Sequence, residues 1–174
     1  MNYHKKKQGC KHMNIVVAVD ENGGIGYQGD LLVSIPLDHQ RFRKQTINKV
    51  VVMGRKTLES LPQGQPLGQR DNIILSADPA YRCRHAEVAH SMDEALKLLE
   101  KYPSEDIYII GGESVYRQFL PYVDTIYMTK IDYAYHADAY FPKLDPEEWE
   151  ETECSDEQTY FDLIYYFVRY DRKK

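Results

Sequence analysis

Residues 50–60 read VVVMGRKTLES and residues 109–116 read IIGGESVY, and these two segments carry most of the information about fold class. Each is a run of Val or Ile that passes through glycine into a segment of helical composition. Such a junction leaves backbone N–H groups free at the positive end of a helix dipole, where anions bind. Arg55 and Lys56 add two positive charges to the first junction, which favours a phosphate ligand. A solvent-exposed basic turn capped by Thr57 would have the same sequence, so both interpretations remain.

The second segment lacks the spacing of the common nucleotide-binding motifs. Neither GxGxxG nor GxxxxGK[ST] occurs in it, which disfavours a standard Rossmann or P-loop site. Adjacent glycines let another molecule approach the backbone closely, but they also occur in tight turns that bind nothing. The glycine pair by itself is therefore compatible with either a ligand site or a plain turn.

Other short Val- and Ile-rich runs alternate with helical segments on both sides of these two. We predict strands over 15–19, 50–53, 73–75, 107–110 and 126–129, and helices over 37–46, 92–101 and 113–120. Ser91 and Glu94 form a capping box that marks the start of the second helix. Continuous rather than alternating hydrophobicity is typical of parallel strands covered on both faces. The order predicts an α/β fold with crossover helices, closed by an antiparallel strand or hairpin over 160–170.

Length and composition favour one globular domain. The chain has 174 residues, 43% hydrophobic and 28% charged, with a formal net charge of −5. Residues 1–12 contain four lysines and no acid, so we expect a disordered basic extension there and a single domain over 13–174. The acidic remainder argues against a nucleic-acid partner, and no apolar run is long enough to cross a membrane. Three widely spaced cysteines fit a reducing cytoplasm, and the scattered histidines give no metal site.

A candidate acid lies in residues 34–46, SIPLDHQRFRKQT. Pro36 favours a helix start, and Asp38 and Phe42 lie four residues apart on one helix face. If that face turns toward the sheet, the carboxylate can accept hydrogen bonds from a cationic or amidine-like ligand beside an aromatic ring. An Asp in a first helical turn is more often an exposed cap or dipole partner. The segment alone leaves both roles open.

Taken together and in this order, the segments resemble dihydrofolate reductase. The resemblance runs without a gap from 15 to 60, resumes in LGQRDNIILS at 67–76, and continues through IIGGESVYRQFLP, IYMTKID, DAYFP and EEWE. It implies a central, mostly parallel eight-stranded sheet with an antiparallel C-terminal edge strand and about four flanking helices. It also implies NADPH-dependent reduction of 7,8-dihydrofolate to 5,6,7,8-tetrahydrofolate for one-carbon metabolism. The expected protein is a cytoplasmic monomer that binds dihydrofolate and antifolate inhibitors.

The resemblance assigns roles to individual residues of this chain. Asp38, assisted by Thr129, would hold the pterin ring, and Leu31 belongs to a loop over 22–32 that closes on the nicotinamide; these three are the expected catalytic residues. Those implied to bind substrate are Val16, Ala18, Asp38, Phe42, Leu67, Arg70, Ile110 and Thr129. Those implied to bind NADPH are Ala18, Ile25, Gly54, Arg55, Lys56, Thr57, Ser76, Ile110, Gly111, Gly112, Glu113, Ser114, Val115 and Tyr116.

Three departures from the family pattern bear on these roles. Where the family commonly reads Leu-Pro-Trp, residues 31–33 read LLV, and Val33 removes an indole N–H that usually anchors a water. His39 replaces a usually apolar contact to the benzoyl group of the substrate. Ser114 stands where some relatives have Arg, which leaves Arg55 and Lys56 with more of the selectivity for NADPH.

Two other functions are compatible with the sequence. One is a related reductase that acts on another pterin or on a riboflavin precursor. Arg70 argues against it, because those substrates have no glutamate carboxylate to bind. The other is a non-catalytic pteridine- or nucleotide-binding module, which the substitution at Val33 makes conceivable.

Overall fold

The two strand–glycine–helix segments lie side by side, because β4 (Val50–Gly54) and β7 (Ile107–Gly111) are neighbouring parallel strands. Each strand leads directly into a helix, α2 (Arg55–Ser60) after β4 and α4 (Glu113–Phe119) after β7. The two glycine junctions therefore meet at one edge of the sheet. That edge holds the carboxyl ends of the parallel strands, where open α/β sheets commonly bind ligands.

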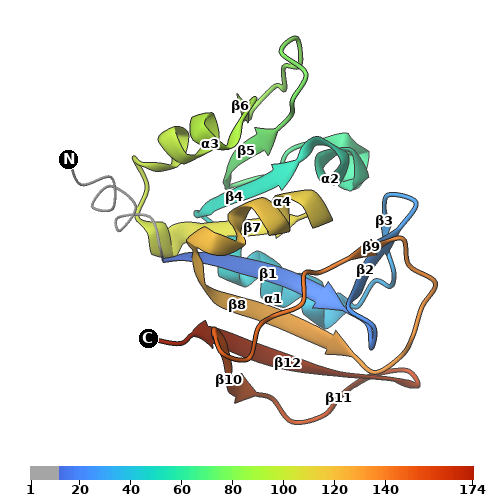
Figure 1. Cartoon of the computed structure of the whole chain (residues 1–174). Helices are drawn as coiled ribbons and strands as arrows, with labels where there is room; N and C mark the ends of the chain where they lie inside the picture. The colour runs from blue at the N-terminus through green and yellow to red at the C-terminus, as the bar shows by residue number, and fades with distance from the viewer. Residues whose placement is uncertain (1–11) are drawn as a thin grey trace.

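A computed structural model describes residues 12–174, and its main sheet has the strand order β10-β12-β8-β1-β7-β4-β5-β6, with β11 paired to β12 (Figure 1). The remaining strands of this sheet are β1 (Met13–Val19), β5 (Asp71–Leu75), β6 (Glu87–Ala89), β8 (Val123–Ile131), β10 (Trp149–Cys154), β11 (Gln158–Tyr160) and β12 (Leu163–Arg172). Strands β1 and β4 to β8 run parallel to one another, whereas β12 is antiparallel to both β8 and β10. The predicted mostly parallel sheet with an antiparallel C-terminal edge is confirmed, and three strands, β10, β11 and β12, form that edge.

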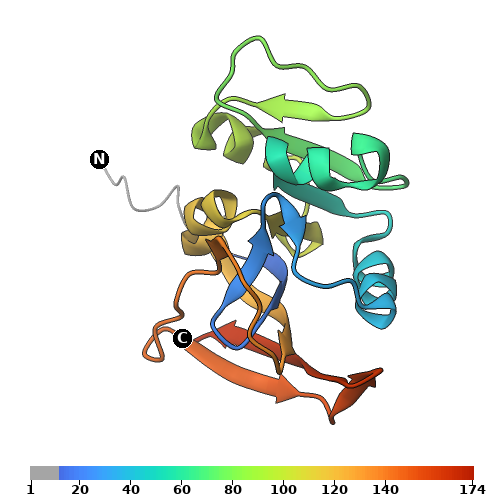
Figure 2. The same cartoon turned by 90° about the vertical axis from the view of Figure 1, so that its right-hand side faces the viewer.

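The two faces of the sheet carry different helices. Helices α3 (Met92–Leu99) and α4 bury Ala95, Leu99 and Phe119 in the hydrophobic cluster on one face. Helix α2 buries Leu58 against the other face, where α1 (Pro36–Thr46) also places Phe42. Figure 2 shows α3 and α4 on one side of the sheet and α1 on the other. This double cover explains why Val50 to Met53 are all buried and why their sequence is continuously apolar.

A small second sheet lies beyond the carboxyl end of β1. It has the order β3-β2-β9 and consists of β2 (Gly24–Tyr27), β3 (Asp30–Leu31) and β9 (Ala139–Tyr140) (Figure 1). Single turns of 3-10 helix, at Pro62–Gly64, Ser104–Asp106 and Leu120–Tyr122, complete the elements. The small sheet joins the loop after β1 to the segment after β8, so both approach the glycine junctions together.

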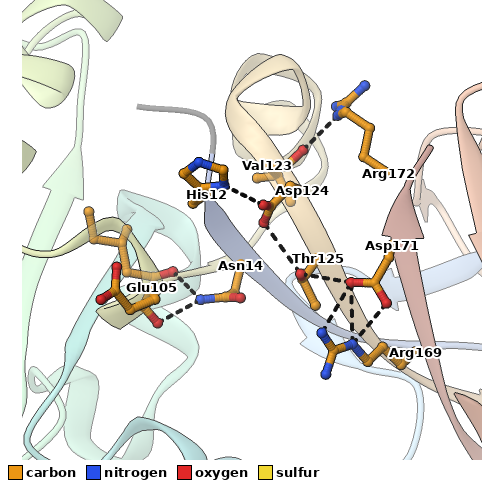
Figure 3. A network of polar contacts seen from close by, with 10 residues as sticks. His12, Asn14, Glu105, Val123, Asp124, Thr125, Arg169, Asp171 and Arg172 are labelled. Carbon is orange, nitrogen blue, oxygen red and sulfur yellow. Dashed lines mark hydrogen bonds and ion pairs between the residues drawn. The ribbon is translucent and has the colours of Figure 1, made fainter. Parts of the chain in front are cut away.

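A polar network ties the strands together at the opposite end of β1 (Figure 3). His12 Nδ1 lies 2.6 Å from Asp124 Oδ2, and the Thr125 hydroxyl donates to Asp171 Oδ1 over 3.1 Å. Arg169 forms an ion pair with the same Asp171 carboxylate. The network joins the start of the described chain to β8 and β12. The disordered extension expected before residue 13 falls almost wholly in residues 1–11, which lie outside the described part.

Three further observations concern residues 12–174. No helix there combines the length and hydrophobicity that a membrane crossing requires. Within the same residues, no three His, Cys, Asp or Glu side chains gather closely enough to hold a metal ion. Cys83 and Cys154 are free thiols.

Candidate active site

Asp38 faces the sheet instead of capping its helix. Helix α1 begins at Pro36, and its N-cap residue Ile35 makes no side-chain cap hydrogen bond. The Thr129 hydroxyl, on the buried strand β8, donates to Asp38 Oδ1 over 2.6 Å. The sequence left open whether Asp38 is an exposed helix cap or a carboxylate turned toward the sheet. In the structure the carboxylate is turned toward the sheet.

The surroundings of Asp38 shift its acidity. Burial raises the pKa of the carboxyl above its usual range. The hydrogen bond from Thr129 and the nearby charges of His39 and Arg41 oppose this effect in part. Asp38, Thr129, Phe42 and Arg41 line a cavity of about 20 Å³, enough for one water molecule. The result is a carboxyl group that binds a proton, or a partner that donates one, more readily than an exposed aspartate.

A second cavity, of about 200 Å³, lies between the small sheet and the second glycine junction. Ala18 and Ile110 supply apolar wall, and Ile25 faces them from β2. Leu31 lines the same cavity but is 63% exposed, which places it at the rim. The Gly111–Gly112 peptide bond is cis, and both glycines line this cavity.

A third cavity, of about 450 Å³, continues along the same sheet edge past the first glycine junction. It shares Lys56, Thr57, Gly112 and Glu113 with the second cavity, so the two form one trough across the ends of β4 and β7. The expected cofactor-binding residues that line the third cavity are Gly54, Arg55, Lys56, Thr57, Ser76, Gly112, Glu113, Ser114 and Val115.

The glycines at these junctions differ in how much room surrounds them. A Cβ at Gly54 would lie 3.2 Å from Val115 Cγ2, tighter than most such contacts, whereas one at Gly112 would lie 3.5 Å from Thr57 Oγ1, an ordinary contact. Gly111 has a φ of +126°, a conformation that side-chain-bearing residues rarely adopt. The backbone of both junctions is thereby open to the trough, beside the cationic side chains of Arg55 and Lys56. An elongated ligand that carries phosphates fits this donor set.

Tyr116 connects the trough to the strand next to Asp38. Its hydroxyl donates to the backbone oxygen of Val16 over 2.8 Å, and its ring is buried. Burial raises the pKa of the Tyr116 phenol above its usual range, so the group stays neutral and keeps donating. The hydrogen bond holds β1 against α4, with Ala18 lining the second cavity two residues after Val16.

Arg70 lies near Phe42, on the face of the sheet that α1 covers. Its Nε donates to the backbone oxygen of Gly68 over 2.9 Å, and its Nη1 donates to Thr46 Oγ1 over 3.2 Å. Its guanidinium carbon is 5.9 Å from the centre of the Phe42 ring, and Leu67 packs in the same hydrophobic cluster as Phe42. Three of the expected substrate residues are thus brought together at the end of α1 away from Asp38.

The departures from the family pattern also have defined positions. Val33 packs beside Ile35 in the cluster behind α1. His39 is exposed, and its Nε2 lies 2.9 Å from Ser34 Oγ. The Ser114 hydroxyl accepts a hydrogen bond from Gln118 Nε2 over 3.0 Å.

Two acidic residues at the site were not identified from the sequence. Asp78 Oδ2 lies 3.6 Å from Arg55 Nη1, and Asp138 Oδ2 accepts a hydrogen bond from the backbone N–H of Gln28 over 3.0 Å. Asp78 follows Ser76 by two residues, so its proximity to the expected phosphate site could have been inferred. Asp138 and Gln28 are 110 residues apart, and no local pattern links them.

A further cavity of about 890 Å³ lies on the far face of β8 and β12 and is lined by Met128, Trp149 and Tyr170, among others. None of the expected site residues lines it. We therefore take the trough and the surroundings of Asp38 as the candidate site, although this further cavity is larger.

Comparison with known proteins identifies the family. The profile of the dihydrofolate reductase family matches residues 12–172. The chain is 35% identical over 164 residues to a dihydrofolate reductase of Staphylococcus haemolyticus, covering 92% of this chain and 95% of the relative. It is 33% identical over 165 residues to that of Bacillus subtilis (strain 168), with 92% and 95% coverage.

A solved structure agrees with these relatives. The dihydrofolate reductase from Enterococcus faecalis, complexed with NADP(H) and RAB-propyl, superposes with a TM-score of 0.84 at 30% identity, covering 95% of this chain and 98% of that one. Sequence and fold agree over nearly the whole chain, which therefore belongs to the dihydrofolate reductase family.

Proposed function

We propose that this protein is an NADPH-dependent dihydrofolate reductase that converts 7,8-dihydrofolate to 5,6,7,8-tetrahydrofolate. The observation that carries the proposal is the inward-facing Asp38, hydrogen-bonded to Thr129 and flanked by a trough suited to a phosphate-bearing cofactor. A half-buried acid beside an apolar wall suits a flat heterocycle that donates hydrogen bonds. Family membership supports both the proposed cofactor and the proposed substrate.

The trough would hold NADPH, which supplies the hydride when bound. Arg55 and Lys56, with Thr57 and Ser76, would bind its phosphates at the first junction. The backbone from Gly111 to Val115 would receive the second phosphate group and the nicotinamide ribose. Ala18, Ile25 and Ile110 would exclude water from the nicotinamide, and Leu31 would close the rim.

The carboxylate of Asp38 would bind the 2-amino group and N3 of the pterin ring, and Thr129 would hold the carboxylate in place. A carboxylate there stabilises positive charge on the ring, which favours a substrate protonated at N5 and ready to accept hydride at C6. Because the carboxylate faces the opposite edge of the ring, the proton would reach N5 through water. Val16, Phe42 and Ile110 would fix the ring, so that catalysis rests mainly on orientation in a dry site.

Arg70 supports folate as the substrate in preference to a riboflavin precursor. Its guanidinium lies near Phe42 and Leu67, where the benzoyl group would pack. From there it would bind the α-carboxylate of the glutamate as a paired hydrogen bond. The residues proposed to bind dihydrofolate and NADPH complete one site without a second subunit, which is compatible with a monomer. The free thiols of Cys83 and Cys154 are compatible with a reducing cytoplasm.

The test is a spectrophotometric assay with the purified protein, NADPH and dihydrofolate. We expect the absorbance of the reduced nicotinamide to fall only when both compounds are present, with tetrahydrofolate as the product. Binding of both compounds without turnover would contradict the proposal in favour of a binding module. Turnover of a riboflavin precursor but not of dihydrofolate would contradict it in favour of the related reductase.

A further inference from the structure

The guanidinium of Arg55 already has anionic partners. Its Nε donates to Glu59 Oε1 over 3.0 Å, and its Nη1 lies 3.6 Å from Asp78 Oδ2. The guanidinium carbon is 4.4 Å from the centre of the Tyr81 ring. Arg55 is 43% exposed, so a phosphate can reach it from the trough. A phosphate bound there would therefore compete with two carboxylates for the positive charge of Arg55.

The two carboxylates are held in different ways. Glu59 lies one turn after Arg55 on the same short helix, and its side chain is 58% exposed. Asp78 belongs to the turn after β5, where its Oδ1 accepts a hydrogen bond from the backbone N–H of Ala80 over 2.9 Å. The backbone oxygen of Asp78 also accepts from the N–H of Tyr81 over 3.1 Å. The turn therefore fixes the Asp78 carboxylate with Oδ2 toward Arg55.

Few positive charges offset Asp78 at this end of the trough. Among the residues that line the third cavity, Arg55 and Lys56 are the permanent cations. His90 lines it as well, but its Nδ1 lies 2.9 Å from the backbone oxygen of Ser76. Ser114, a further lining residue, brings no charge. Asp78 therefore offsets part of the positive charge that a doubly charged phosphate would meet here.

We propose that Asp78 is a specificity-determining residue that competes with the 2′-phosphate of NADPH for Arg55, and so narrows the preference for NADPH over NADH. The proposal rests on the function proposed above, in which Arg55 binds that phosphate. Asp78 opposes a 2′-phosphate by like-charge repulsion. A cofactor without this phosphate leaves the Arg55–Asp78 pair intact and presents a ribose hydroxyl, the group that a carboxylate accepts from in NAD-binding sites.

The test measures binding, by calorimetric titration of the enzyme with NADP⁺, NAD⁺ and adenosine 2′,5′-bisphosphate. Asp78→Asn keeps the acceptor for Ala80 and removes the charge. We expect this variant to bind NADP⁺ and the bisphosphate about fivefold more tightly, the scale of exposed charge pairs, with NAD⁺ unchanged or weaker. Glu151→Gln is the matched control, because Glu151 is an exposed acid on β10, at the far edge of the sheet. It should leave all three affinities unchanged.

Two outcomes would overturn the proposal and can be told apart. In the first, Asp78→Asn changes the affinities for NADP⁺ and NAD⁺ equally or not at all, while Arg55→Ala still lowers the affinity for NADP⁺. Asp78 then has no role in specificity, and the proposed function stands. If Arg55→Ala leaves NADP⁺ binding unchanged, the phosphate assignment itself fails, and the role of Asp78 fails with it. The unfolding temperature of each variant shows whether a change in affinity reflects a loss of fold.

Discussion

The Thr129 hydroxyl donates a 2.6 Å hydrogen bond to Asp38 Oδ1, joining the middle of the sheet to the first turn of α1. Thr129 is 5% exposed and Asp38 is half-buried, so the hydrogen bond is partly shielded from water. A hydrogen bond to a charged acceptor is shorter and stronger than one between neutral groups. The pair therefore fixes both the position of the carboxylate and the direction of the oxygen that remains for a ligand.

Replacing Asp38 with Asn should remove most of the turnover at neutral pH. Asn is close to Asp in size but carries no charge to stabilise a protonated pterin. We expect kcat/KM for dihydrofolate to fall about 100-fold or more, the usual scale for loss of such a group. Part of the rate should return at low pH, where the substrate arrives already protonated. A rate that is unchanged across the pH profile would remove Asp38 from the mechanism.

The same substitution should stabilise the fold. Burial raises the pKa of Asp38 in the folded protein above that of an exposed aspartate. The folded state then binds the proton more tightly than the unfolded state, so stability falls as pH rises from the unfolded pKa through the folded one. Asp38→Asn lacks this loss and should be more stable than the native protein at neutral pH, a common trade-off at functional sites. Urea unfolding of both proteins at acidic and neutral pH checks this. The variant should gain stability relative to the native protein as the pH rises, and an equal free energy of unfolding for the two proteins at neutral pH would contradict the prediction.

Thr129→Val should move the acid limb of the pH–rate profile to higher pH. Without the hydroxyl, Asp38 loses a hydrogen bond that lowers its pKa, so burial raises that pKa further. The variant should also lose about 1 kcal/mol of stability. Thr129→Ser is the matched control, because it keeps the hydroxyl and should keep the profile. If the Val and Ser variants gave the same profile, the hydrogen bond would have no part in tuning Asp38.

The parallel core of the fold could be predicted because its signal is local and strong. Val50 to Met53 are continuously apolar, and all four are buried in β4. The predicted start of α3 is confirmed by the hydrogen bond from the backbone N–H of Glu94 to Ser91 Oγ, at 3.1 Å. The side chain of Glu94, however, accepts from the backbone N–H of His90 instead of that of Ser91.

The strands that sequence reasoning missed have weak local patterns. Strand β2 reads GIGY and has no hydrophobic alternation, and its partners β3 and β9 have two residues each. Strand β10 reads WEETEC, in which only Trp149 is buried because the strand forms the edge of the sheet. The Asp38–Thr129 pair spans 91 residues, so only the resemblance to a family could suggest it before the structure.

Asp138 should control how firmly the loop over the second cavity is held. Its Oδ2 accepts from the backbone N–H of Gln28, next to residues 29–31 that line that cavity. Asp138→Ala removes the acceptor, so we expect NADPH to dissociate several-fold faster and kcat to fall. Asp138→Asn keeps an acceptor and should lie between the Ala variant and the native enzyme. Stopped-flow displacement of NADPH measures the dissociation rate, and equal rates in all three proteins would refute the role.

Arg70 should discriminate substrates by their glutamate. Burial lowers the pKa of Arg70, with the charge of Arg43 acting in the same direction, but the guanidinium stays protonated at neutral pH. Arg70→Met should therefore raise the KM for dihydrofolate about 100-fold, the usual scale for a paired hydrogen bond to a carboxylate, with little change in kcat. Dihydropteroate lacks the glutamate, so its KM should be nearly the same for both enzymes. Arg70→Lys keeps the charge without the paired geometry, so its KM for dihydrofolate should lie between those of the native enzyme and the Met variant. A KM that rises equally for both substrates would mean that Arg70 supports Thr46 and Phe42 structurally instead of binding the tail.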